Sequence, residues 1–197
     1  MLENEFEKQY WPKLVMGIDE AGRGPLCGPL VVACCILRPN YQNDLINDSK
    51  KLTAKKREAL FKIIIKDALY YDFRIVSPKE IDELNIYQAT KKAMTELALS
   101  HETAIVLTDA MPLNADIKHE AMIKGDAKSI SIAAASILAK VVRDKIMMGY
   151  DILYPQYEFK SHKGYPTKKH LALLEENGLL DIYRMSYGPC LRIKNRI

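Results

Sequence analysis

The sequence predicts an α/β protein built on a mixed β-sheet. Apolar runs typical of strands come first, helical patterns then alternate with further strands, and the chain ends in helical segments. The chain has 197 residues, of which 48% are hydrophobic, and this suffices for one compact domain with a real core. The sequence contains no internal repeat and no low-complexity linker, so a second full-sized domain is not expected.

The first part of the chain predicts two strands joined by a glycine-rich turn. The strands are Leu14–Ile18 and Leu30–Leu37, and the turn covers residues 21–29. A third strand is expected at Tyr70–Val76, which is rich in β-forming residues. Before it, the stretch Thr53–Asp67 has apolar residues at helical spacing and begins with a threonine suited to an N-cap.

Two helices are expected in the middle of the chain. Ser77 to Glu80 forms a capping box with proline at the first helical position, so a short helix begins there. Asn85 caps the next helix, and its buried stripe consists of Ile86, Ala89, Ala93 and Leu97.

The second half predicts two more strands and two more helices. Ala104–Thr108 has the continuous apolar character of an interior strand, and Ala121–Ile123 is a weaker candidate. Ser129–Met148 is a long alanine-rich helix that is apolar on most faces, so we expect it to be buried against the sheet. A last helix, Lys168–Asn177, has a threonine N-cap before it and a glycine stop after it.

The composition limits the classes of partner and compartment. The formal net charge of +4 permits a nucleic-acid partner, and the basic end from Lys160 onward is the expected contact surface. Four cysteines lack any C-x-x-C spacing, so neither a zinc site nor a disulfide framework is expected. The acidic N-terminus has no apolar signal region, and no run reaches the length of a membrane span. We therefore expect a cytoplasmic protein without membrane contact.

Acidic residues follow three of the predicted strands. They are the pair Asp19 and Glu20, then Asp109, then Asp126. If those strands are neighbours, the four carboxylates converge and repel one another unless cations neutralise them. Two divalent ions about 4 Å apart would do so, and carboxylates are hard ligands suited to Mg²⁺ or Mn²⁺. Adjacent strand residues point to opposite faces, so Asp19 and Glu20 share a site only if the strand ends or twists there.

Each of these residues also has a purely structural interpretation. A lone acid after a strand is often a cap, and Asp126 could cap the helix that starts at Ser129. The segment Gly22–Gly24 could be an ordinary tight turn, and Tyr165 a packed loop residue. Lys50 and Lys51 precede the helix that begins at Thr53 and could bind backbone phosphates, or they could belong to a solvated basic face. Ser129 lies on the first turn of its helix and could bind a phosphate there, or it could be a helix cap.

Four sequence blocks, in this order, closely resemble the ribonuclease HII family. They span most of the chain and read GIDEAGRGPLCGPLV, NDSKKLT, KGDAKSISIAAASILAKVVRD and HKGYPTKKH. The resemblance implies a ribonuclease H-like three-layer fold, with a central mixed β-sheet flanked by helices and a C-terminal helical extension. We expect the catalytic domain at residues 1–150 and the extension at 151–197, packed on the same domain and contributing substrate contacts.

The resemblance also implies an activity and roles for individual residues. The expected enzyme hydrolyses the RNA strand of RNA–DNA hybrids and nicks duplex DNA 5′ of a single ribonucleotide, as a monomer, with Mn²⁺ or Mg²⁺. The products carry 5′-phosphate and 3′-hydroxyl ends. The family's metal-binding acids correspond to the four carboxylates named above. The backbone of Gly22-Arg23-Gly24 is expected at the ribose 2′-hydroxyl, and Tyr165 on the following deoxyribose.

Some features depart from the family or leave alternatives open. Ala110 follows the third acid where many relatives have glycine, and the tail has Tyr183 and Tyr187 where histidine and phenylalanine are common. His162 and His170 are too isolated for a metal site and are expected at the surface or facing a phosphate. A junction resolvase of the same fold is the alternative enzyme, and a non-catalytic hybrid-binding module is the alternative outside enzymes.

Overall fold

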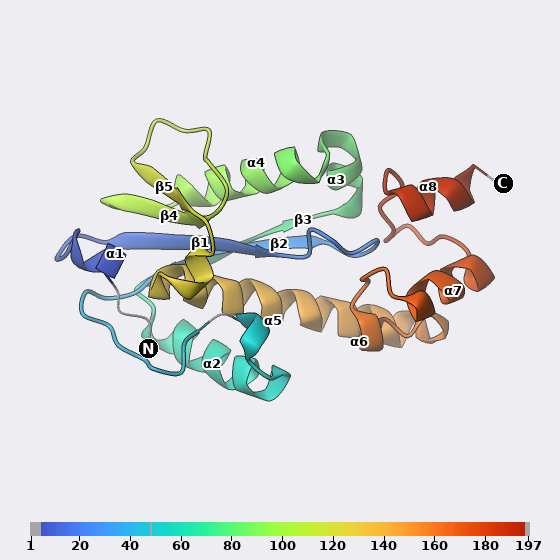
Figure 1. Cartoon of the computed structure of the whole chain (residues 1–197), viewed down its shortest axis with the longest axis horizontal. Coiled ribbons are helices and arrows are strands. Elements are labelled where there is room, and N and C mark those ends of the chain that lie inside the picture. Colours follow the sequence, from blue (N-terminus) through green and yellow to red (C-terminus); the bar gives the residue numbers. More distant parts are fainter. Residues whose placement is uncertain (1–4, 48, 196–197) are drawn as a thin grey trace.

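The computed structural model describes residues 5–47 and 49–195, and it confirms the predicted α/β class. A five-stranded sheet forms the middle layer and helices cover both of its faces (Figure 1). The strand order is β3-β2-β1-β4-β5. The first three strands are antiparallel, and β4 and β5 run parallel to β1. The strands are β1 Val15–Ala21, β2 Leu30–Ile36, β3 Tyr70–Val76, β4 Ile105–Asp109 and β5 His119–Met122.

The helices follow the predicted order, with additional short elements. The α-helices are α1 Glu5–Lys8, α2 Ala54–Asp67, α3 Pro78–Leu84, α4 Ile86–Ala98, α5 Ile130–Leu153, α6 Phe159–His162, α7 Lys168–Asn177 and α8 Gly188–Lys194. Three short 3₁₀ turns are η1 Ser49–Lys51, η2 Gly125–Ala127 and η3 Pro155–Tyr157. The N-caps predicted at Thr53, Ser77, Asn85 and Thr167 are confirmed, because each side chain accepts a hydrogen bond from the backbone N–H three residues ahead. Ser129, for which capping was the structural alternative, caps α5 in the same way.

The first strand is longer than predicted. β1 extends through Asp19 and Glu20 to Ala21, because all three residues pair with β2. Alternate β1 side chains therefore face opposite layers. Met16 and Ile18 face the core that includes α4 residues, whereas Ala21 belongs to the core shared with α5.

Helix α5 packs against the sheet over Gly17. Most of its residues from Ile130 to Val141 are buried, which confirms the prediction of a helix buried against the sheet. A Cβ atom at Gly17 would lie 2.1 Å from the backbone carbonyl carbon of Ser131. Only glycine permits so close an approach between strand and helix. The contact places the first turns of α5 against β1, two residues before Asp19.

The C-terminal elements gather at one end of the sheet (Figure 1). Helices α6, α7 and α8 share a buried cluster with Leu26 and Cys27 from the loop that joins β1 to β2. A single β-bridge links Cys27 to Tyr183. The expectation that His162 and His170 lie at the surface is wrong, because both rings are buried and stacked with their centroids 4.0 Å apart. Nε2 of His162 lies 2.8 Å from the Tyr157 carbonyl oxygen, and Nδ1 of His170 lies 2.9 Å from that of Tyr165.

Two further expectations concern cysteines and membranes. The four cysteines are buried free thiols, and a buried free cysteine behaves as a small apolar side chain. In the described ranges, no helix combines the length and the apolar character needed to cross a membrane.

Candidate active site

Three aspartates from separate elements converge at one edge of the sheet. Asp19 lies on β1, Asp109 is the last residue of β4, and Asp126 lies in η2. Parallel pairing of Ile18 with Thr108 places the first two side by side. One carboxylate oxygen of each aspartate lies within 4.8 Å of the others. The Gly125 N–H donates to Oδ1 of Asp109 over 2.8 Å, which fixes η2 against the end of β4.

Glu20 reaches the same site from the opposite face of β1. Because β4 ends at Asp109, the edge of β1 beside Glu20 has no neighbouring strand on that side. The carboxylate therefore opens into a cavity of about 200 Å³ that Asp19, Asp109 and the turn Gly22–Gly24 also line. The strand does not end at the acidic pair, because β1 continues to Ala21. The neighbouring strand β4 ends at Asp109, which leaves room for the Glu20 carboxylate beside that of Asp19.

The electrostatics of the cluster favour binding of cations. Asp19 and Asp126 are only 4% exposed. Burial, and then the charges of Glu20 and Asp109, raise the pKa of Asp19 well above its usual value. Burial raises the pKa of Glu20 to about 7, although Arg23 opposes this with a guanidinium nitrogen 3.6 Å from the Glu20 carboxylate. The Lys50 ammonium lies 3.4 Å from Asp126.

The residues present fit a hard divalent cation. Oε2 of Glu20 is buried and has no hydrogen-bond partner within the described part of the chain. Such an atom is costly unless a ligand satisfies it. The donors that converge here are carboxylate oxygens, which are the ligands of Mg²⁺ and Mn²⁺. Asp19, Asp109 and Asp126 therefore form a candidate cation site that suits Mg²⁺ or Mn²⁺ in charge and chemistry, and Glu20 lines the cavity beside them.

The glycine-rich turn and Tyr165 also line the cavity. Gly22 has a φ of +106°, a conformation that side chains rarely adopt. A Cβ at Gly24 would lie 3.6 Å from the Tyr165 ring, which is 42% exposed. The guanidinium of Arg23 points toward the Glu20 carboxylate.

The three weaker site predictions have different outcomes. Lys50 lines the cavity, and Lys51 is exposed on the same turn without lining it. The structure contradicts a substrate contact for Ser129. This residue is fully buried, caps α5, and donates its hydroxyl hydrogen to Glu7 over 2.6 Å. Its structural interpretation is therefore the correct one.

Sequence reasoning missed several residues that support the site. Ser136 and Ser49 share a hydrogen bond of 2.9 Å beside the cavity, and Ser136 also bonds to Asp19. Arg143 and Arg184 are buried and bind carbonyls of the glycine-rich loop. A charged residue on the apolar α5 was a signal for Arg143, whereas nothing in the tail distinguished Arg184.

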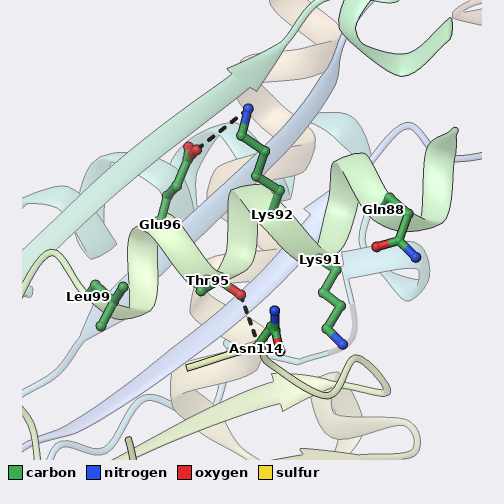
Figure 2. Close-up of a pocket in the computed structure, with 7 residues that line it drawn as sticks. All are labelled: Gln88, Lys91, Lys92, Thr95, Glu96, Leu99 and Asn114. Atoms are coloured by element: carbon green, nitrogen blue, oxygen red, sulfur yellow. Dashed lines mark hydrogen bonds and ion pairs between the residues drawn. The ribbon is translucent and has the colours of Figure 1, made fainter. Parts of the chain in front are cut away.

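A second hollow lies on the outer surface of α4 (Figure 2). Lys92, Thr95 and Glu96 among its lining residues have partners within the fold. Lys92 pairs with Glu96 and Glu80, and the backbone N–H of Asn114 donates to the Thr95 hydroxyl over 3.3 Å. The hollow contains one carboxylate and neither cysteine nor histidine among its lining residues. The cavity at the four acids is therefore the candidate active site.

The raised pKa of Glu20 predicts a pH-dependent stability. Between the ordinary value of 4.5 and about 7, the folded protein binds this proton more tightly than the unfolded chain. Its stabilising contribution is therefore complete at low pH and lost as the pH rises through about 7. Thermal unfolding in EDTA across this range should show a steeper loss for the wild type than for Glu20→Gln. Superimposable profiles would contradict the assignment, and saturating Mg²⁺ or Mn²⁺ should restore wild-type stability at high pH.

The family comparison agrees with the geometry. The family model described as Ribonuclease HII matches residues 16–190. A Ribonuclease HII from Francisella tularensis subsp. novicida (strain U112) is 54% identical over 179 residues, which cover 89% of this chain and 97% of that protein.

Solved structures agree with both the fold and the family. The ribonuclease H2 of Pyrococcus horikoshii OT3 has a TM-score of 0.81 at 30% identity, covering 93% of this chain and 98% of that one. The ribonuclease HII of Archaeoglobus fulgidus, solved in complex with PCNA, has a TM-score of 0.76 at 28% identity, covering 88% and 95%. The chain therefore belongs to the ribonuclease HII family and is a metal-dependent nuclease.

Proposed function

We propose that this protein hydrolyses the RNA strand of RNA–DNA hybrids and nicks duplex DNA on the 5′ side of a single embedded ribonucleotide. One observation carries the proposal: Asp19, Glu20 and Asp109 line the same cavity as the glycine-rich turn and Tyr165. Asp126 joins Asp19 and Asp109, with carboxylate oxygens within 4.8 Å of one another. Groups that bind cations thus lie beside backbone that can approach a ribose. The 2′-hydroxyl is the group that distinguishes RNA from DNA, so a selective nuclease must contact it close to the scissile bond.

The acids are proposed to hold the cations for hydrolysis. Asp19, Asp109 and Asp126, together with Glu20, supply the oxygen ligands. Mg²⁺ or Mn²⁺ held by these carboxylates would lower the pKa of a water and would stabilise negative charge on a leaving oxygen. Because the 2′-hydroxyl is recognised and does not attack, the products carry 5′-phosphate and 3′-hydroxyl ends.

The turn and Tyr165 are proposed to select the cleavage position. At Gly22 and Gly24 no side chain separates the peptide groups from the cavity. The exposed face of Tyr165 offers a stacking surface for the sugar that follows the ribonucleotide. We further propose that residues 151–197 act as an extension of the catalytic domain 1–150 and contribute this contact, and that the protein acts as a cytoplasmic monomer.

One gel experiment tests the proposed function. An end-labelled duplex with one ribonucleotide, an RNA–DNA hybrid, an all-DNA duplex and a four-way junction are each incubated with the protein and Mg²⁺, Mn²⁺ or EDTA. We expect cleavage of the first two substrates with either metal and none in EDTA. Cleavage of the junction alone would favour a resolvase, and binding of hybrids without turnover would favour a binding module.

Replacing Tyr165 by alanine should impair nicking at a single ribonucleotide. Loss of a stacking surface typically costs about 1–3 kcal/mol per base, so we expect kcat/KM to fall roughly 5- to 150-fold. Tyr165→Phe keeps the ring and should remain near the wild-type rate. The measurement is single-turnover nicking of the single-ribonucleotide duplex. An unchanged rate for Tyr165→Ala would exclude the proposed role of this ring at the junction.

A further inference from the structure

A buried arginine of the C-terminal tail is bound to the carbonyl side of the glycine-rich turn. Arg184 lies between α7 and α8 and is 0% exposed. All five N–H groups of its guanidinium have acceptors, with donor–acceptor distances of 2.6 to 3.2 Å. The acceptors are the carbonyls of Gly22, Arg23 and Gly28 and the hydroxyl of Tyr187. The Tyr187 hydroxyl in turn donates to the Arg23 carbonyl over 2.8 Å.

The charge of Arg184 is compensated mainly by peptide dipoles. No carboxylate of the described residues lies within ion-pair distance of its guanidinium, and burial lowers its pKa. Burying a cation without a direct counter-ion is costly, and hydrogen bonds to every donor reduce that cost. The arrangement is therefore sensitive to any change that removes a donor or moves the turn.

These hydrogen bonds determine where the turn's own N–H groups point. In a trans peptide the C=O of one residue and the N–H of the next point in opposite directions. Since the carbonyls of Gly22 and Arg23 point to Arg184, the N–H groups of Arg23 and Gly24 point away from it. Within the described residues, neither N–H donates to a protein acceptor. Both belong to residues that line the cavity beside the four acids.

A second buried arginine supports the loop from the side of α5. Arg143 donates to the carbonyls of Cys27, Pro29 and Lys163. A Cβ at Gly22 would lie 2.1 Å from Nε of Arg143, so the turn is packed closely against this side chain. Arg143 thus fixes the base of the loop, while Arg184 binds the carbonyls of the turn itself.

We propose that Arg184 is a positioning residue for ribose selection, which holds the carbonyls of Gly22 and Arg23 so that the next two N–H groups face the substrate 2′-hydroxyl. The inference rests on the proposed function, because it assumes that the turn recognises ribose. It adds that the selectivity of the turn depends on a side chain more than 150 residues away in the sequence. Tyr187 has a smaller role through its bond to the Arg23 carbonyl.

Binding to matched duplexes tests this proposal. In an Asp126→Asn background, which we expect to bind without rapid cleavage, fluorescence anisotropy compares a duplex containing one ribonucleotide with an all-DNA duplex of the same sequence. The parent should prefer the first by about fivefold or more, the value of one net hydrogen bond. Arg184→Lys, which keeps the charge but cannot supply five donors, should reduce this ratio toward one without weakening all-DNA binding. Tyr187→Phe should reduce it less.

Two controls separate positioning from general stability. Leu174→Ala removes a buried side chain of the same C-terminal cluster, and it should lower the unfolding temperature while leaving the ratio intact. With Asp126 present, Arg184→Lys should lower kcat/KM about 10- to 100-fold, as for a slightly misplaced binding group. If the parent binds both duplexes equally, the proposed ribose recognition fails. If the parent discriminates and both Arg184→Lys and Tyr187→Phe discriminate equally well, only the role of Arg184 fails.

Discussion

Replacing Asp126 by asparagine is expected to reduce cleavage by at least about 10²–10³-fold while duplex binding is retained. Asp126 contributes one of three aspartate oxygens that lie within 4.8 Å of one another. Asparagine has nearly the same shape but carries no charge, so the cation site loses affinity and the phosphate-binding surface does not. The measurement is single-turnover cleavage of the single-ribonucleotide duplex, with the dissociation constant measured on the same duplex in EDTA.

The same change should raise stability when no metal is present. Asp126 is buried in a site where several carboxylates repel one another, and removing one charge relieves part of that repulsion. The unfolding temperature of Asp126→Asn in EDTA should therefore exceed that of the wild type. Stabilisation by Mg²⁺ or Mn²⁺ at a fixed concentration should shrink, because a ligand that binds only the folded state stabilises it less when it binds more weakly.

Asp116→Asn is the matched control for this variant. Asp116 is exposed on the loop between β4 and β5 and does not line the cavity. Its replacement by asparagine therefore removes the same charge without touching the candidate site. It should leave cleavage and metal stabilisation unchanged. Near-normal cleavage by Asp126→Asn would remove Asp126 from the catalytic site, whatever the effect on stability.

Local sequence rules predicted the parts of the fold that depend on local physics. The helices after Thr53, Ser77 and Asn85 begin where predicted, because an N-cap is decided by a few neighbouring residues. The long helix α5 was also found, since its alanine-rich apolar character is visible in any window of the sequence. Its C-terminal end was placed five residues too early, at Met148 instead of Leu153.

The parts that were missed depend on partners distant in sequence. The strand β1 continues through Glu20 because it pairs with Val32 of β2, which the apolar pattern of β1 alone does not reveal. The burial of His162 and His170 follows from the packing of α6 and α7, and isolated histidines carry no signal for it.

The candidate site shows the same division. The aspartates were found because the ends of parallel strands meet at one edge of a sheet. This rule applies without knowing which strands are neighbours. The position of Glu20 could not be predicted without knowing where β4 ends. The role proposed for Arg184 could not be predicted without knowing how the C-terminal tail packs against the glycine-rich turn. Positions set by one element are therefore predictable, whereas positions set by the contact of two elements require the structure.

Replacing Gly17 by alanine is expected to destabilise the protein by about 3 kcal/mol or more, at the upper end of overpacking effects. The new Cβ would lie 2.1 Å from the Ser131 carbonyl carbon, and 2.3 Å from the Ile132 nitrogen. Both atoms belong to the backbone of α5, so no side-chain rotation relieves the clash. For a chain of this size the unfolding temperature should fall by roughly 10 °C, as measured by calorimetry.

Gly149→Ala, within α5, should have the opposite effect on stability. Gly149 is exposed on α5, and a Cβ there would meet no atom within 4 Å. Alanine should therefore stabilise the protein by about 0.5–1 kcal/mol, the usual difference from glycine inside a helix. Gly17→Ala should also slow cleavage, because a shift of α5 against β1 moves η2 and Asp126 relative to Asp19, whereas Gly149→Ala should not. Equal stability of the two variants would show that α5 does not need its close contact with β1 to form the site.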